Sequence, residues 1–202
     1  MTEVNVIPKL THRQRQALVT RDLIVNAATD LFLEHGYAAT TIDAIAARAD
    51  VAVSTVYNAF TNKRGILRAI RETWHQRSGQ RELYRLASLE PTFTLRLEQA
   101  AHATRRQWET SARMMTVYTA AAAVDTEAAA ELHEALSGRR ENLGRLIRSW
   151  AADAQRDSDH AASIFLALTR PEVYLELTGA SGWTAEQYEV WLATLLKQQL
   201  AY

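Results

Sequence analysis

The segment from residue 24 to residue 67 constrains the fold most, because short apolar stripes alternate there with residues that stop helices. Five residues recur at three- and four-residue steps and predict one buried helix face: Ile24, Ala27, Ala28, Leu31 and Phe32. Gly36 can end this helix, since glycine accepts the positive φ of a helix C-terminus. Thr40 and Thr41 precede a second apolar stripe, from Ile42 to Ala49, and can cap its free N–H groups.

A third short helix is predicted from Val53 to Phe60, after a tight turn. Val56 and Phe60 lie four residues apart and predict its buried side, whereas its other side is small and polar. Asp50 falls in the turn, where glycine is favoured but aspartate tolerates a left-handed backbone better than most residues. Ala46 is small enough to lie beneath this helix. The pattern therefore predicts a helix-turn-helix.

A fourth helix is predicted to begin at Lys63, with Asn62 as its cap. Ile66, Leu67 and Ile70 share its buried side. Its N-terminus can hold a phosphate, because unpaired N–H groups and the helix dipole point the same way. The segment as a whole is typical of a protein whose third helix enters a DNA groove.

This segment resembles the tetracycline-repressor (TetR) family of transcriptional regulators. The matching residues are Ala27, Ala28, Leu31, Phe32, Gly36, Thr40, Thr41, Ile42, Ile45, Ala46, Ala49, Val51, Thr55, Val56, Tyr57, Phe60, Lys63 and Leu67. Two positions depart from the family pattern: Asp50, where glycine is common, and Ala52, where a helix-capping serine is frequent. The resemblance implies a DNA-binding homodimer whose C-terminal domain binds a small-molecule effector.

We therefore expect an all-α fold, with an N-terminal three-helix helix-turn-helix domain and a larger C-terminal helical domain. Residues 1–19 are expected to form a flexible basic arm, residues 20–66 the DNA-binding domain, and residues 67–202 the effector-binding and dimerisation domain. The net charge is zero, yet residues 1–80 hold 10 Lys and Arg against 7 Asp and Glu. The basic residues of the arm region are either a solvated tail or phosphate and minor-groove contacts, and they are Lys9, Arg13, Arg15 and Arg21.

Side-chain chemistry suggests which residues touch DNA. The candidates are Thr41, Val53, Ser54, Thr55, Tyr57, Asn58 and Lys63. The tyrosine, the lysine and the threonine hydroxyls suit phosphate contact, while the valine, serine and asparagine suit base edges. The alternative is that Tyr57 only packs under the fourth helix and Thr55 only caps its own helix.

The rest of the chain predicts helices around a site for an apolar effector. Methionine and aromatic side chains line adaptable space, and the candidates are Trp108, Met114, Met115, Tyr118 and Trp150. The alternative is that these residues are ordinary core. Arg105, Arg106 and Arg113 do not indicate an anionic effector, because surface arginines on helices are usually solvated.

The last forty residues predict two antiparallel apolar helices. One runs to Arg170, Pro171 kinks it or starts a new segment, and Thr184 with Gln187 forms a capping box for the last helix. The resemblance implies that this pair meets its twin across a two-fold axis, with candidate contacts at Phe165, Leu168, Tyr174, Tyr188, Trp191 and Leu195. The alternative is that both helices only close the core of their own subunit. A two-fold dimer predicts a palindromic operator.

Other function classes find little support in the sequence. There is no cysteine, no glycine-rich phosphate loop and no nucleophile elbow, so no catalysis and no cofactor are expected. Three pairs could each supply two metal ligands but lack further ligands at suitable spacing: Glu98 with His102, Asp157 with His160, and His133 with Glu134. No membrane span or signal peptide is recognisable, so we expect a cytoplasmic protein. The competing interpretation is a helical ligand-binding protein without operator function.

Overall fold

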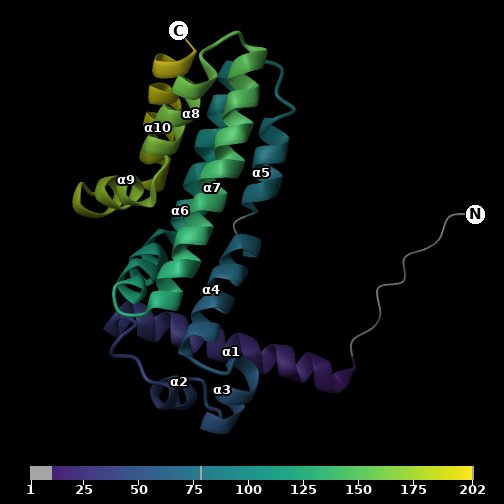
Figure 1. Ribbon diagram of the computed structural model, residues 1–202, viewed down its shortest axis with the longest axis vertical. Coiled ribbons are helices and arrows are strands. Elements are labelled where there is room, and N and C mark those ends of the chain that lie inside the picture. The colour runs from purple at the N-terminus through teal and green to yellow at the C-terminus, as the bar shows by residue number, and fades with distance from the viewer. Residues whose placement is uncertain (1–10, 78, 202) are drawn as a thin grey trace, which may run out of the picture. The chain divides into compact units, whose positions relative to one another are not determined.

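The computed structural model describes residues 11–77 and 79–201, and their regular elements are all helical (Figure 1). The chain divides into two compact units, residues 1–70 and 71–202. The first unit holds α1 (His12–His35), α2 (Ile42–Arg48), α3 (Val53–Phe60) and the start of α4 (Lys63–Arg77). The second unit holds the end of α4 and then α5 (Gln80–Ala87), α6 (Phe93–Ala122), α7 (Thr126–Asp153), α8 (Ser158–Leu168), α9 (Pro171–Leu175), the π-helical turn η1 (Glu176–Ala180) and α10 (Ala185–Leu200). The all-α prediction is confirmed.

The predicted helix ends in the first unit are confirmed by their backbone geometry. Gly36 has a φ of 81° and ends α1, and Asp50 has a φ of 54° in the turn before α3. Thr41 caps α2 by accepting a 3.1 Å hydrogen bond from the Ala44 N–H. Asn62 caps α4, because its Oδ1 accepts a 2.8 Å hydrogen bond from the Gly65 N–H. Local sequence thus sets where these helices begin and end.

The core of the first unit is built from the predicted apolar stripes. Ala46 of α2 is 2% exposed, as its place beneath α3 requires. The other buried side chains come from all four helices: Ile24, Ala28, Leu31, Phe32, Ile45, Val56, Phe60, Ile66, Leu67 and Ile70. Burying this apolar area is the main stabilisation of so small a unit.

The start of the chain differs from the prediction. Thr11 forms a capping box with Gln14, and α1 begins at His12, so residues 12–19 are helical rather than part of a flexible arm. Residues 1–10, with Lys9, lie outside the described residues. The first unit ends at Ile70, inside α4, whereas the boundary was expected after residue 66.

The second unit is a layered helical bundle. Asp125 caps α7 after a short turn that follows α6, so α6 and α7 run antiparallel, and α8 packs back on α7. Pro171 starts α9, the helix before it ends at Leu168, and the predicted capping box of α10 is present. α10 packs on α6 and α8. No helix in the described ranges has both the length and the hydrophobicity to cross a membrane.

Candidate nucleic-acid interface

The outer side of α3 gathers four of the predicted DNA contacts. Tyr57 is 51% exposed and Val53 36%, and Ser54 and Asn58 are exposed as well. Val56 and Phe60, on the opposite side, are buried. The short helix therefore presents small and polar side chains, with one phenol, away from the core. The exposed side of α3 therefore has the small and polar character that the sequence predicts for a helix that enters a DNA groove.

The two predicted threonine contacts lie in different settings. Thr41 is exposed at the start of α2, where its hydroxyl oxygen is already the cap of that helix. Its O–H remains a possible donor to a phosphate, because a hydroxyl has one donor and two acceptor lone pairs. Thr55 is half-buried within the first turn of α3.

Arg21 of α1 holds the C-terminal end of α3. Its Nη1 donates a 3.1 Å hydrogen bond to the carbonyl oxygen of Ala59, and its guanidinium carbon lies 4.2 Å from the centre of the Phe60 ring. The sequence pattern placed Arg21 among the basic residues of an arm. The structure instead gives it the role of fixing one helix against another. The sequence did hold a signal for this packing role, because Arg21 lies one turn before the buried Ile24 on the same side of α1.

Lys63 was predicted to contact phosphate, but its ammonium group lies among backbone carbonyls. Its Nζ donates to the carbonyl oxygens of Tyr37 at 2.6 Å and Thr40 at 2.8 Å, and it lies 4.3 Å from the centre of the Tyr37 ring. These contacts tie the start of α4 to the loop between α1 and α2. The geometry gives Lys63 a positioning role within the first unit.

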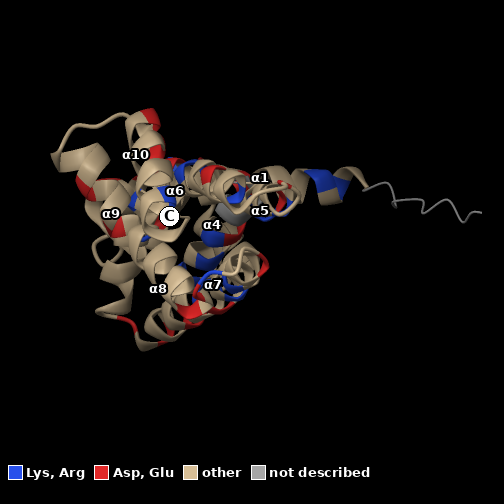
Figure 2. Cartoon of the chain, turned by 90° about the horizontal axis from the view of Figure 1, so that it is seen from above, with Lys and Arg blue, Asp and Glu red and all other residues tan. Residues whose placement is uncertain are grey.

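Basic residues at the start of α1 remain exposed (Figure 2). Arg13 and Arg15 lie in its first turns, where Figure 2 shows Lys and Arg in blue. Arg48 of α2 forms an ion pair with Glu34, with 3.0 Å between its Nη2 and the Glu34 Oε2. The hydrogen bond from Arg48 lowers the pKa of the Glu34 carboxyl.

Comparison with known proteins agrees with this geometry. Residues 24–70 match the family model described as bacterial regulatory proteins of the tetR family. The first compact unit thus matches the TetR family of bacterial regulators. The match ends where the first compact unit ends, at Ile70. No curated protein sequence matches the chain.

Solved structures extend the likeness in fold over nearly the whole chain. The fatty acid degradation regulator FadR from Bacillus halodurans has a TM-score of 0.70 at 18% identity, covering 94% of this chain and 96% of that one. FadR from Bacillus subtilis in complex with stearoyl-CoA has a TM-score of 0.67 at 19% identity, with 87% and 96% covered. The SmeT–triclosan complex has a TM-score of 0.70 at 23% identity, with 89% and 90% covered. The two-unit helical architecture is thus shared with these three proteins.

The predicted effector residues do not form one group in the second unit. All five are buried or half-buried, and Trp108, Met115 and Trp150 belong to the main core. Met114 and Tyr118 are buried further along α6. Because α6 and α7 are antiparallel, Trp150 lies beside the first turns of α6, about 15 Å along the axis from Trp108 at 1.5 Å per residue. One small ligand would not span the whole set.

Three of the predicted dimer contacts lie in the core of their own chain. Phe165 and Tyr188 are 0% exposed and Tyr174 is 7% exposed. Tyr174 and Tyr188 pack edge to face, with 4.9 Å between ring centres. The apolar stripes predicted for α8, α9 and α10 are present. A stripe does not show, however, whether the same chain or a second copy buries it.

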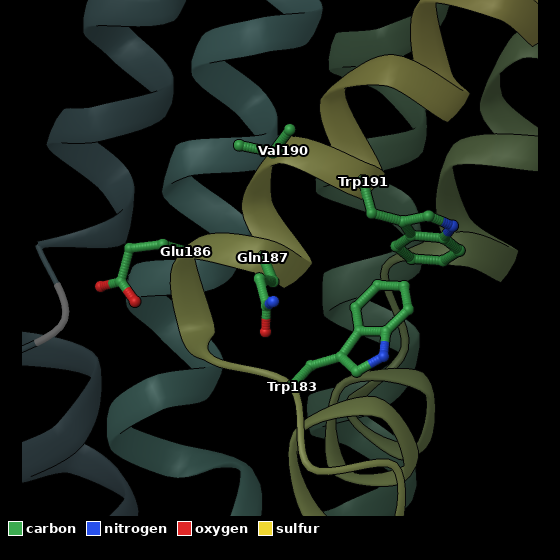
Figure 3. A pocket seen from close by; sticks show the side chains of 5 residues that line it. All are labelled: Trp183, Glu186, Gln187, Val190 and Trp191. Atoms are coloured by element: carbon green, nitrogen blue, oxygen red, sulfur yellow. The ribbon is translucent and has the colours of Figure 1, made fainter.

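Leu168, Trp191 and Leu195 are half-buried and remain available to a partner. Beside Trp191, an open apolar groove on α10 is lined by Trp183, Val190 and the side chains of Glu186 and Gln187 (Figure 3). The two tryptophan rings meet edge to face at 6.0 Å. Val190, which the sequence analysis did not select, is 68% exposed.

Residues of two of the three candidate metal pairs serve in ion pairs or as a helix cap. Glu98 accepts a 2.6 Å hydrogen bond from Lys197, and His102 lies 3.1 Å from Glu189, so both tie α6 to α10. Asp157 caps α8 through the backbone N–H groups of residues 159 and 160. Within the described ranges, no three His, Asp or Glu side chains come together as a metal site. Arg105, expected to be solvated, is instead paired with Glu189 at 2.7 Å.

Proposed function

We propose that this TetR-family regulator acts in the cytoplasm as a homodimeric repressor, released from a palindromic operator by a small-molecule effector. The observation that carries the proposal is the exposed side of α3, where Val53, Ser54, Tyr57 and Asn58 project from a helix held in place by Arg21. These four side chains are exposed and do not pack in the core of the first unit. Their exposure is accounted for by a partner that the described residues do not contain.

The proposed DNA contacts are of two kinds: contacts to phosphates, which position the protein, and contacts to base edges, which read the sequence. Tyr57 and the hydroxyls of Thr41 and Thr55 are assigned to phosphates, which fix the register of the protein on the duplex. Val53, Ser54 and Asn58 are assigned to base edges, where valine suits a thymine methyl group and asparagine suits adenine. Lys63 is assigned to support of the loop before α2, in keeping with its contacts to carbonyl oxygens.

The dimer is assigned to the partly exposed apolar residues of α8 and α10, which include Leu168, Val190, Trp191 and Leu195. A two-fold axis would set two copies of α3 in successive major grooves, about 34–36 Å apart. The operator is therefore expected to be a palindrome.

Effector control is assigned to the second unit, in line with relatives of the same fold that were solved with triclosan and with stearoyl-CoA. An effector binds more tightly to the form of the dimer that binds DNA poorly. The difference between its binding free energies for the two forms sets how far it can lower the DNA affinity. Repression relieved by ligand is the simplest such scheme.

The test is a selection of bound duplexes from a random or genomic pool at a stated salt concentration. We expect the wild-type protein to enrich a palindrome and Tyr57→Ala to lose that enrichment. Val124→Ala is the matched control, since Val124 is 67% exposed in the second unit and has no assigned contact. Circular dichroism melting of all three proteins shows whether each is folded.

Failure to enrich any duplex, with all three proteins folded, would favour a ligand-binding helical protein without operator function. Equal enrichment by Tyr57→Ala would instead remove Tyr57 from the interface while leaving the DNA-binding function in place.

A further inference from the structure

Arg139 of α7 points into the core of the second unit at the C-terminal end of α8. One of its terminal nitrogens donates to the carbonyl oxygen of Thr169 at 2.8 Å and to the Thr169 hydroxyl oxygen at 2.9 Å. The indole N–H of Trp108 donates to the same carbonyl at 3.0 Å, and the Arg139 guanidinium carbon lies 5.5 Å from the centre of the Trp108 ring. Thr169 and Trp108 are both buried. A full positive charge thus meets two neutral oxygens.

The charge of Arg139 has no carboxylate partner among the described residues. The acidic residue whose charge acts on it, Glu172, is held in a fork by Arg170, with contacts of 3.0 and 3.1 Å. Burial lowers the pKa of Arg139, but a guanidinium keeps its proton in proteins. Arg139 is half-buried and its Nε atom is fully buried, and a charge that is largely removed from water is normally paired. This arginine is therefore set up for an anion that the chain does not supply.

Two donors in this cluster lack hydrogen-bond partners among the described residues. They are the Nε–H of Arg139 and the hydroxyl of Tyr188, and both atoms are buried. Burial raises the pKa of Tyr188, so this hydroxyl stays protonated and can donate. Each unpaired buried donor carries a desolvation cost that an acceptor would remove. Two unpaired donors beside one unpaired charge specify an acceptor with negative charge.

Aromatic rings surround these donors. Tyr84 packs on Phe165 with 6.5 Å between ring centres, and its hydroxyl pairs with the buried Thr104 at 3.1 Å. Tyr174 lies edge to face against Tyr188. Trp108 lies against the Arg139 guanidinium, and Tyr84 and Tyr188 lie close enough for their phenols to interact with its charge. Such a lining selects a flat hydrophobic body as well as an anionic group.

We infer that the Arg139 cluster, between α6, α7 and the junction of α8 with α9, binds a compact aromatic carboxylate. The carboxylate accepts from the Arg139 guanidinium and from the Tyr188 hydroxyl, and its ring packs against Trp108. The bond from Arg139 to Thr169 keeps the guanidinium oriented for this contact. Aromatic carboxylates would then be the effector class of the regulator, and this role rests on the proposed function. Binding of the carboxylate itself does not.

The test measures binding of benzoate to the full-length protein by calorimetry, with benzamide as the uncharged analogue of the same shape. We expect benzoate to bind, and Arg139→Gln to weaken binding about 10- to 100-fold, as loss of a hydrogen bond to a charged group does. Tyr188→Phe removes only a hydroxyl and is expected to weaken binding roughly 3- to 10-fold. The matched control is Arg140→Gln, because Arg140 is the exposed neighbour of Arg139 and should leave the affinity unchanged.

Thermal melting of each variant without ligand shows whether it is folded. If Arg139→Gln does not fold, Tyr188→Phe and the comparison of benzoate with benzamide decide the question. The inference is overturned if benzoate does not bind at millimolar concentration, if benzamide binds equally well, or if the folded Arg139 and Tyr188 variants bind benzoate like the wild type. Arg139 would then only anchor the end of α8.

Duplex binding without ligand separates this inference from the proposed function. Operator binding with no benzoate binding would leave the regulator in place and remove the carboxylate site. Benzoate binding that depends on Arg139, in a protein that selects no duplex, would support the site and contradict the regulator. Release of the selected duplex by benzoate, lost in Arg139→Gln, would support both.

Discussion

Gly65 lies in the first turn of α4, where a side chain would collide with the end of α3. A Cβ built there comes 2.2 Å from the carbonyl oxygen of Phe60, which is backbone and cannot rotate away. The glycine therefore permits a close approach between two helix ends. Gly138, inside α7, has no atom within 4 Å of the corresponding position and needs no such freedom.

Gly65→Ala is expected to destabilise the first unit by about 1–3 kcal/mol, the usual cost of overpacking. Gly138→Ala is the matched control and should stabilise by about 0.5–1 kcal/mol, since alanine is the better helix former. Thermal melting followed by circular dichroism measures both. A Gly65→Ala protein as stable as wild type would show that the end of α3 can shift.

Lys63 allows its two possible roles to be separated by salt dependence. Each phosphate contact contributes about 0.9 to the slope of log affinity against log salt concentration. Because the Lys63 ammonium is held by the carbonyls of Tyr37 and Thr40, we expect Lys63→Gln to lower the melting temperature and operator affinity while leaving this slope unchanged. A slope reduced by about one unit with unchanged stability would instead show a phosphate contact.

At the scale of single elements, α3 is held firmly at its end and weakly at its start. Arg21 fixes the C-terminal end, while Ala52 at the N-cap has an extended backbone and no side-chain hydrogen bond. The first turn thus lacks the side-chain acceptor that a serine would offer, although the Thr55 N–H donates to the Ala52 carbonyl oxygen at 2.9 Å. Thr41 and Asn62 supply such caps to α2 and α4.

Ala52→Ser is expected to stabilise the protein by about 0.5–2 kcal/mol, because the backbone at this position is already that of an N-cap. Ala47→Ser, at an exposed position inside α2, is the control and should destabilise slightly, by about 0.5 kcal/mol. Both are measured by thermal melting. If Ala52→Ser brings no gain, the free N–H groups are already satisfied by water.

At the scale of the whole molecule, one chain leaves part of its apolar surface on α10 uncovered. Val190 is 68% exposed beside the groove formed by Trp183 and Trp191 (Figure 3). Substituting an exposed residue leaves the subunit core intact. The surface therefore offers a way to test assembly separately from folding.

Val190→Glu is expected to convert a dimer into monomers at micromolar concentration, since two like charges would meet across the two-fold axis. Val124→Glu, which adds the same charge at a position 67% exposed, should leave the dimer unchanged. Sedimentation velocity measures the oligomeric state, and operator affinity should fall with the loss of the dimer. A Val190→Glu protein that still sediments as a dimer would place the interface elsewhere.

Local sequence decided most of the first unit. The stripe of α1, the stop at Gly36, the left-handed Asp50 and the cap at Asn62 were all predicted, and all depend on neighbours within a few residues. Contacts between distant residues were not predictable in this way. From the sequence, the side chains of Arg21 and Lys63 could contact solvent, phosphate or a neighbouring helix. The structure decides between these settings, because it places the Ala59 carbonyl beside Arg21 and the Thr40 carbonyl beside Lys63.

The second unit shows the same division more sharply. Helix positions, the break at Asp125 and the capping box of α10 follow from periodicity and caps, because hydrogen bonding within a helix is local. An apolar stripe indicates that a helix side is buried, but it does not tell which residues bury it. Tyr188 was therefore assigned to the dimer interface, although the core of its own chain encloses it. Arg139 lies on the same side of α7 as Leu143 and Trp150, a spacing that could have predicted that its side chain faces the core. The sequence by itself determined the helices and the family, whereas packing decided which charges are paired, because burial and pairing depend on residues far apart in the chain.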